Sequence, residues 1–199
     1  MAGREKRIES FRALCALIRE DLQVESGQFS RPGFQAIAVH RFGVWKHGID
    51  SKPLRMPMTV IYRLANLFVR NVYGIELKLE TRIGRRVRFT HQHGITVHMY
   101  AVIGDDCVIR QMVTIGQYRG FADGELPTAP RLGKRVQVGV GAVVAGDIDI
   151  GDDAQIGPNA VVMSNVPNGA IVTAPPSRVM VGPPRRKLEP VEPVRETGT

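Results

Sequence analysis

Residues 132–167 divide into six consecutive six-residue units, LGKRVQ, VGVGAV, VAGDID, IGDDAQ, IGPNAV and VMSNVP. The first place of every unit holds an aliphatic residue, and the fifth place holds a small or β-branched one. A period of six with frequent Gly at the second place does not match the 3.6-residue period of an α-helix. It is typical of a parallel β-helix, in which each unit supplies one short strand and one turn.

The same period continues upstream of this stretch. Its further first places are Ile83, Phe89, Ile95, Ile103, Ile109 and Ile115. The step from Ile95 to Ile103 is eight residues, which predicts a two-residue insertion at a corner. The step from Ile115 to Leu132 is seventeen, which is one unit plus eleven extra residues. With three strands closing one triangular coil, the twelve units from Ile83 to Pro167 predict a prism of about four stacked coils.

The rest of the chain differs in pattern from the repeats. Apolar residues at helical spacing predict an N-terminal helical domain over 1–75, and Pro53 and Pro57 are expected to break the chain before its third helix. The fold class expected is therefore mainly β, a left-handed parallel β-helix over 76–182 with an N-terminal α-helical domain. A loop at 117–130 should leave the prism. The tail at 183–199 is rich in Pro and charge and is expected to be disordered.

Composition limits the cellular setting. The net charge of +8 and the pI near 10.0 are compatible with a solvated basic surface, a phosphorylated small molecule, an anionic membrane or nucleic acid. No basic patch is interleaved with aromatic residues, which disfavours nucleic acid. The N-terminus lacks a signal-peptide pattern, and no stretch is apolar enough to span a bilayer. Cys15 and Cys107 lie far apart. A cytoplasmic protein with reduced thiols is expected, with peripheral membrane contact left open.

A β-helix of this kind, with an eleven-residue excursion and a preceding helical segment, resembles the serine acetyltransferase family. The resemblance runs from about residue 20 to residue 181. It rests on five short motifs, which are IGR at 83–85, THQHGI at 90–95, GDD at 104–106, VTIG at 113–116 and APPSR at 174–178.

The resemblance implies an O-acetyltransferase with a histidine as general base. The family's histidine precedes a small-residue and Gly step on the first complete coil, and His91 matches that position. An acidic residue stands fifteen positions upstream of it in the family, usually Asp, and Glu76 stands there in this chain. An alcohol must lose its proton as it attacks a thioester, and a positioned imidazole accelerates such a step by about 10²–10⁴. A carboxylate on the far ring nitrogen would fix the tautomer.

The resemblance also implies acetyl-CoA as a co-substrate, no permanently bound cofactor, and a homotrimer. In the family, coenzyme A lies in the groove between neighbouring prisms, against backbone exposed by small residues. The matching positions here are Gly116, Gly139, Val140, Gly141, Gly157 and Pro158, with Arg178 placed to meet the nucleotide phosphates. Each of these glycines equally serves the turn in which it stands.

The other histidines have two interpretations each. His93 falls at a fifth place, where a small inward residue is usual, so it is either a core histidine or part of the acceptor pocket. His98 falls at the two-residue insertion, where a surface position is expected. Three histidines at 91, 93 and 98 suggest a metal site, but no cysteine accompanies them and their spacing does not place all three on one side of a turn. No metal is expected.

The acceptor is where the sequence departs from the serine acetyltransferase pattern. Thr90 replaces the Asp before the catalytic histidine, and Thr128-Ala129 replaces an Arg-His pair. The segment between Gln23 and Gly33 is shortened, so the acidic residue that the family's helical domain supplies is expected to be missing. A zwitterionic amino acid needs opposite charges facing it. The run from Gly104 to Gly120 also resembles the acetyltransferases of colanic acid and exopolysaccharide assembly.

A sugar hydroxyl, met by Thr90, His93 and Tyr118, is therefore the acceptor we expect. Serine is the alternative acceptor. A non-catalytic trimeric scaffold is a further alternative, which the retained pair of Glu76 and His91 disfavours.

Overall fold

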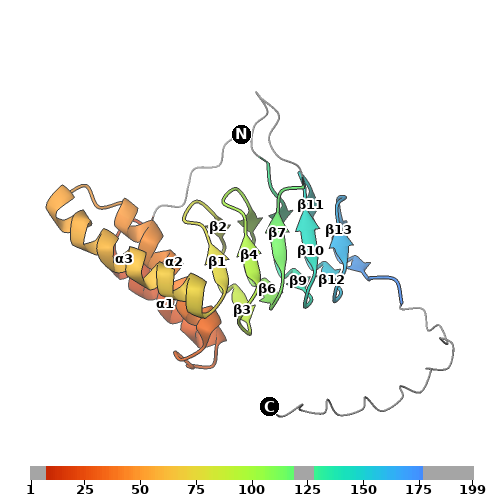
Figure 1. The fold of residues 1–199 in the computed structure, drawn as a ribbon, viewed down its shortest axis with the longest axis horizontal. Coiled ribbons are helices and arrows are strands. Elements are labelled where there is room, and N and C mark those ends of the chain that lie inside the picture. Colours follow the sequence, from red (N-terminus) through yellow and green to blue (C-terminus); the bar gives the residue numbers. More distant parts are fainter. Residues whose placement is uncertain (1–7, 119–127, 177–199) are drawn as a thin grey trace, which may run out of the picture.

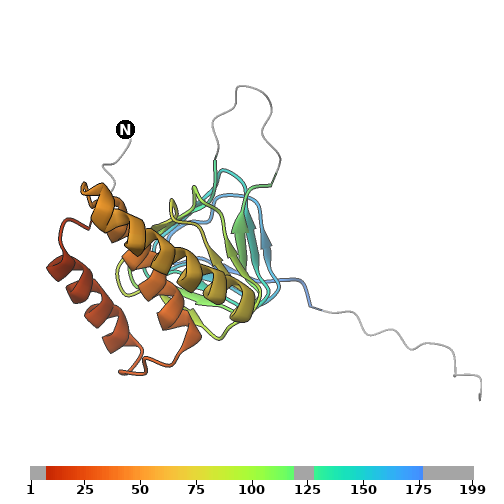
Figure 2. The ribbon, with the colours of Figure 1, turned by 60° about the vertical axis from the view of Figure 1, so that its left-hand side comes forward.

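The computed structural model describes residues 8–118 and 128–176, and it shows three helices against one end of a triangular parallel β-helix (Figure 1). The helices are α1 (Phe11–Val24), α2 (Pro32–His47) and α3 (Lys52–Val72). Figure 2 shows the three helices gathered side by side at this end, which confirms the expected helical N-terminal region. Within the described part of the chain, none of the helices has the length and apolarity that crossing a membrane requires.

Short strands follow the helices and visit three parallel sheets in turn. The first sheet is formed by β1 (Ile75–Leu77), β4 (Ile95–Val97), β7 (Thr114–Gly116), β10 (Val143–Ala145) and β13 (Val161–Val162). The second sheet is formed by β2 (Arg82–Ile83), β5 (Val102–Ile103), β8 (Arg131–Leu132) and β11 (Asp149–Ile150). The third sheet is formed by β3 (Arg88–Thr90), β6 (Val108–Arg110), β9 (Gln137–Val138), β12 (Gln155–Ile156) and β14 (Ile171–Val172).

The core lies inside the triangle and is built from the first and fifth places of the repeat. In the third sheet Ile109 pairs with Phe89 on one side and Val138 on the other, and all three side chains are at most 2% exposed. The small fifth-place residues, such as Ala142 and Ala154, are fully buried where the chain turns. Stacking of equivalent residues in equal register is what a constant period of six predicts, so the expected β-helix is confirmed.

The β-helix is longer than the twelve units counted from the sequence. It begins with β1, whose Leu77 stands six residues before Ile83 and is buried, and it ends with β14. Four coils of three strands each are followed by a fifth coil with two strands in the described chain. The first unit was missed because Lys78 occupies its second place, where the later units mostly carry Gly or another small residue.

The expected chain break at Pro57 is wrong, because α3 begins at Lys52 and continues through this proline. Pro53 stands in the first helical turn, where its missing N–H costs nothing because that group has no partner inside a helix. Pro57 lacks the N–H that would reach the carbonyl of Pro53, so the helix loses a single backbone hydrogen bond. The backbone hydrogen bond two residues before Pro57 is kept, since Arg55 N donates to Ser51 O at 2.9 Å.

A buried arginine joins the helices to the first coil of the β-helix. Arg41 on α2 is 6% exposed and donates to the carboxylate of Asp21 on α1 at 3.1 Å. Its other nitrogens donate to the backbone carbonyls of Ile83, at 2.7 Å, and Gly84. The opposite charge and the hydrogen bonds satisfy a guanidinium that would otherwise be costly to bury. This group therefore fixes how α1 and α2 sit on the second sheet.

The start of α2 lies directly on the third sheet. A Cβ added to Gly33 would come within 1.8 Å of the carbonyl oxygen of Phe89, so only glycine permits this approach. Phe89 belongs to β3, and β3 leads straight into His91. The helical region thus supports the strand that carries the candidate base.

Candidate functional site

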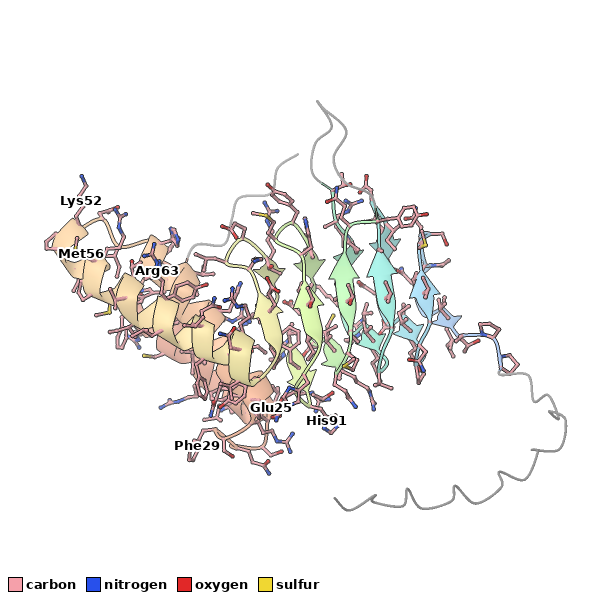
Figure 3. The ribbon with its side chains drawn as sticks, in the orientation of Figure 1. Glu25, Phe29, Lys52, Met56, Arg63 and His91 are labelled. Atoms are coloured by element: carbon pink, nitrogen blue, oxygen red, sulfur yellow. The ribbon has the colours of Figure 1, made fainter. Side chains whose placement is uncertain are left out.

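His91 opens the corner that connects β3 to β4, on the exposed surface of the prism (Figure 3). Its backbone is left-handed, with φ of 66°, and the same corner contains His93 at 73° and Gly94 at 72°. A left-handed conformation is uncommon for residues other than glycine, but it recurs at the corners of this β-helix, as at Asp106, Met112 and Asn159. What distinguishes this corner is its two exposed histidines, and they mark it as the candidate active site.

This corner is the first of a stack of equivalent corners, which we call the His91 corner column, formed by residues 91–94, 111–113, 139–142 and 157–160. Backbone hydrogen bonds join its successive levels. Met112 N donates to His93 O at 3.0 Å, and Gly141 N donates to Gln111 O at 3.1 Å. The predicted coenzyme positions from Gly139 to Gly141 and from Gly157 to Pro158 therefore lie on the same edge of the prism as His91.

Most of these glycines are required by the stacking of the coils. A Cβ on Gly139 would come within 2.7 Å of Pro158 N, and one on Gly141 within 2.2 Å of the Asn159 side chain. Gly116 is different, because a Cβ there would meet nothing nearer than Thr114 Cγ2, at 3.8 Å, and its φ is not left-handed. Packing among the described residues does not explain the glycine at 116, and a ligand or a second chain that approaches this backbone closely would explain it.

Glu76 points outward from β1 in the first sheet. It pairs in register with Thr96 on β4, and Thr96 pairs with Thr114 on β7, so a polar row crosses the sheet. The carboxylate of Glu76 is about one third exposed and contacts Lys78 Nζ at 2.6 Å. Among the described residues, the ion-pair partner of Glu76 is Lys78, and the Glu76 carboxylate makes no hydrogen bond to His91. The predicted pairing of Glu76 with His91 therefore stays a prediction.

Two of the three predicted acceptor residues lie at the His91 corner. Thr90 ends β3, half-buried, with its hydroxyl 3.5 Å from Ile109 O. His93 is exposed, with its Nε2 3.2 Å from Gln92 Nε2. The interpretation of His93 as a core histidine is wrong, although other fifth places are buried. Two consecutive left-handed residues, His93 and Gly94, turn its side chain out of the prism.

The remaining predicted site residues do not join this corner. Gly116 ends β7, and the exposed Tyr118 follows it, so both leave the first sheet at its opposite edge from the His91 corner column. Most of the expected excursion at 117–130, and Arg178 with the expected tail, lie outside the described residues. Within one chain the candidate site is thus divided between the two edges of the first sheet.

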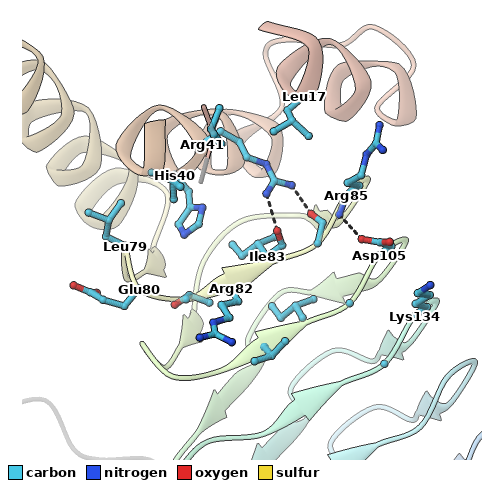
Figure 4. A pocket seen from close by; sticks show the side chains of 18 of the residues that line it. Leu17, His40, Arg41, Leu79, Glu80, Arg82, Ile83, Arg85, Asp105 and Lys134 are labelled. Carbon is cyan, nitrogen blue, oxygen red and sulfur yellow. Dashed lines mark hydrogen bonds between the residues drawn. The ribbon is translucent and has the colours of Figure 1, made fainter. Parts of the chain in front are cut away.

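A hollow of about 990 Å³ lies elsewhere, between the helices and the second sheet (Figure 4). None of the predicted site residues lines it. His40 contributes to its wall, and burial together with the neighbouring Arg41 lowers the pKa of this histidine to about 4. His40 is therefore uncharged near neutral pH. Among the described residues no cluster of His, Cys, Asp or Glu has the composition of a metal site.

Sequence reasoning missed two features at the candidate site. The polar row of Glu76, Thr96 and Thr114 depends on strand register, and three residues that are about twenty positions apart carry no local signal for it. Glu25 is the second feature, because the shortened segment between α1 and α2 does hold an acidic residue. It is buried and paired with Arg31 Nη1 at 2.8 Å, so its charge is already neutralised.

Comparisons with known proteins agree with this architecture. Residues 129–164 match the family model of the bacterial transferase hexapeptide with six repeats. A serine acetyltransferase of Synechococcus elongatus is 36% identical over 75% of this chain and 57% of its own length. A second, from Helicobacter pylori, is 36% identical over 70% of this chain and 75% of its own length. This chain thus spans under two thirds of the first of these relatives.

A shorter relative matches over nearly all of its length. The putative colanic acid biosynthesis acetyltransferase WcaB of Escherichia coli is 32% identical over 81% of this chain and 98% of its own. Among solved structures, a serine acetyltransferase of Entamoeba histolytica superposes with a TM-score of 0.70, at 23% identity, over 87% of this chain and 63% of its own. That likeness identifies the fold as the left-handed β-helix. The chain belongs to the serine acetyltransferase family of hexapeptide-repeat acyltransferases.

Proposed function

We propose that this protein is an acetyl-CoA-dependent O-acetyltransferase whose acceptor is a hydroxyl group of a sugar in an exopolysaccharide or surface-glycan intermediate. The observation that carries the proposal is the exposed corner of His91 and His93, in which His91 stands at the family's catalytic position. Family membership supports the transfer reaction, and the match to nearly all of the colanic acid relative supports the sugar acceptor.

His91 would act as the general base. It would accept the proton of the acceptor hydroxyl as the oxygen attacks the thioester carbonyl of acetyl-CoA. The new C–O bond forms, the C–S bond breaks, and the departing thiolate takes up a proton. No covalent acyl-enzyme and no permanently bound cofactor are needed. We assign Glu76 to the orientation of the imidazole, which requires it to exchange its contact with Lys78 for one with His91.

We further propose that the active protein is a homotrimer. Its support is the division of the candidate site, since His91 and Thr90 lie at one edge of the first sheet while Gly116 and Tyr118 lie at the other. Neighbouring prisms would bring the opposite edges of two chains together, with coenzyme A between them. Light scattering should give about 66 kDa, three times the 21.9 kDa chain, in the presence of acetyl-CoA. A monomer under these conditions would contradict the shared site.

The charges near the site support a sugar rather than an amino acid. Thr90 carries no charge, Ala129 is buried, and Glu25 is neutralised by Arg31. At these three described positions serine would then meet no opposed pair of charges for its ammonium and carboxylate groups. Uncharged donors such as Thr90 and His93 suit a hydroxyl group instead. We place the reaction in the cytoplasm, where the free thiols of Cys15 and Cys107 would stay reduced.

Free serine should therefore bind only in the millimolar range or more weakly, which corresponds to about 4 kcal/mol or less. Thiol release from acetyl-CoA, followed with serine and with a panel of glycosides and nucleotide sugars, measures this directly. Saturable turnover of a glycoside with little turnover of serine is the expected result. Efficient turnover of serine at sub-millimolar concentration would instead establish the second candidate, a serine O-acetyltransferase, which the relatives that are 36% identical favour.

A further inference from the structure

Helix α3 presents a wide apolar surface to the solvent. Eight of its apolar side chains are 45% exposed or more. They are Leu54, Met56, Val60, Ile61, Leu64, Leu67, Phe68 and Val72. Apolar surface that is contiguous on this scale marks an interaction site in soluble proteins. The opposite side of α3, with Val69 at its centre, packs on α2 and β1, so this surface has no partner within the described chain.

The exposed side of α3 has the layout of an interfacial helix. At 100° per residue the eight apolar side chains occupy an arc of about 160° around the helix axis. Lys52, Arg63 and Arg70 fall together along one border of that arc, and Figure 3 shows Lys52 and Met56 at the outer end of α3 and Arg63 near its middle. The helix contains four basic residues and no acidic one. An apolar face bordered by basic residues is the pattern of a helix that lies in a membrane surface.

A further cation from α2 joins this basic border. Lys46 is buried, with its Nζ 5.0 Å from the ring centre of Tyr62 on α3. Burial lowers the pKa of Lys46, and the nearby charges of Arg63 and Arg55 lower it further. None of Lys46, Arg55 and Arg63 forms an ion pair in the described part of the chain. The seam between α2 and α3 thus carries positive charge that the protein does not neutralise itself.

We propose that the exposed face of α3 binds the surface of a bilayer containing anionic lipid. Its apolar arc would enter the boundary between head groups and acyl chains, and its basic border would meet the lipid phosphates. Charge decides against a second α3 helix, packed face to face, as the occupant. Two α3 helices face to face would bring the six basic residues of their borders and no acidic residue of α3 into one interface, and like charges in such an interface repel.

The orientation of α3 also connects this surface to the candidate active site. The helix ends at Val72, and the carbonyl of the next residue, Tyr73, accepts a hydrogen bond from His93 N at 2.7 Å. A bilayer along α3 would therefore lie near the His91 corner. If the proposed function holds, the enzyme would be positioned to act on an acceptor attached to lipid. The binding of α3 to lipid does not depend on that function and can be measured without substrates.

Co-sedimentation with vesicles tests the surface directly. The full chain should bind vesicles of phosphatidylglycerol and phosphatidylcholine, and should bind vesicles of phosphatidylcholine alone at least tenfold more weakly. The double variant Ile61→Glu/Leu64→Glu should lose at least tenfold in binding. Phe29→Glu is the matched control, because Phe29 is 71% exposed but lies outside α3, and its binding should be unchanged. Arg63→Gln/Arg70→Gln should weaken binding about tenfold or more, since each basic residue near an anionic surface contributes roughly fivefold.

Three results would overturn the proposal. They are equal binding of the Glu double variant and the wild type, equal binding to neutral and anionic vesicles, and no binding by the wild type at all. Circular dichroism of every variant shows whether it is folded, and light scattering shows whether its oligomeric mass has changed. A Glu double variant that is folded but has a smaller mass, together with a wild type that ignores vesicles, would assign the surface to a second copy. Failure of acetyl transfer with intact vesicle binding would count against the proposed function alone.

Discussion

Replacing His91 with Ala should lower kcat by a factor of about 10² or more, because the acceptor hydroxyl would lose its proton to water instead of to a positioned imidazole. Binding of acetyl-CoA, measured by calorimetry, should be unchanged, since the base acts only as the acceptor attacks. His47→Ala is a suitable control, because His47 is exposed in the last turn of α2 and far along the chain from the corner. Full activity of the His91 variant would remove the central assignment.

Variants of Glu76 and Lys78 refine this result. Glu76→Gln should cost less than the loss of His91, because it removes an orienting group and not the base. Lys78→Met separates two roles of Glu76, whose carboxylate contacts Lys78 Nζ at 2.6 Å. If Glu76 orients the imidazole of His91, Glu76→Gln should lower kcat while Lys78→Met should not. Equal and small effects of both variants would mean that Glu76 serves only as the ion-pair partner of Lys78.

Replacing Arg41 with Met should lower the free energy of unfolding by about 3–5 kcal/mol, the range for breaking a buried ion pair from one side. The change leaves the carboxylate of Asp21, which is 2% exposed, without its cation, and it leaves the carbonyls of Ile83 and Gly84 without their donor. Figure 4 shows Arg41 reaching across from α2 to these carbonyls. Urea denaturation followed by circular dichroism measures the loss.

Arg135→Met provides the control for this measurement. Arg135 forms a two-pronged contact with Asp153 at 2.6 Å, but both side chains are about half exposed. Exposed pairs of this kind contribute about 0–1 kcal/mol. Similar losses in the two variants would show that burial of Arg41 does not govern its contribution.

The sequence predicted the β-helix because its signal is repeated in every unit. A first-place residue such as Ile109 or Val138 must fill the same position in every coil, so the period is visible without any structure. The position of His91 at a corner followed from the same period. The exposure of His93 did not, because it depends on local backbone angles that override its place in the repeat.

The period of the repeat does not predict contacts between residues that are far apart in the sequence. Asp21 and Arg41 belong to different helices, and charged side chains are ordinarily expected at the surface. Their burial follows from the way α1 and α2 pack on the first coil, where Arg41 finds two backbone carbonyls. The contact between Glu76 and Lys78 was equally hidden, because it depends on which side chain a carboxylate of β1 meets.

The register between β5 and β8 has a consequence for how this family diversifies. Ile103 pairs with Leu132 although eleven more residues than a regular repeat needs are inserted between Ile115 and Leu132. The strand that follows the insertion, β8, pairs with β5 in the same register as an uninterrupted repeat would give. Lengthening such a segment twofold costs only about 0.6 kcal/mol in closure entropy. Natural selection can therefore rewrite this segment in length and composition while the core beneath it stays the same.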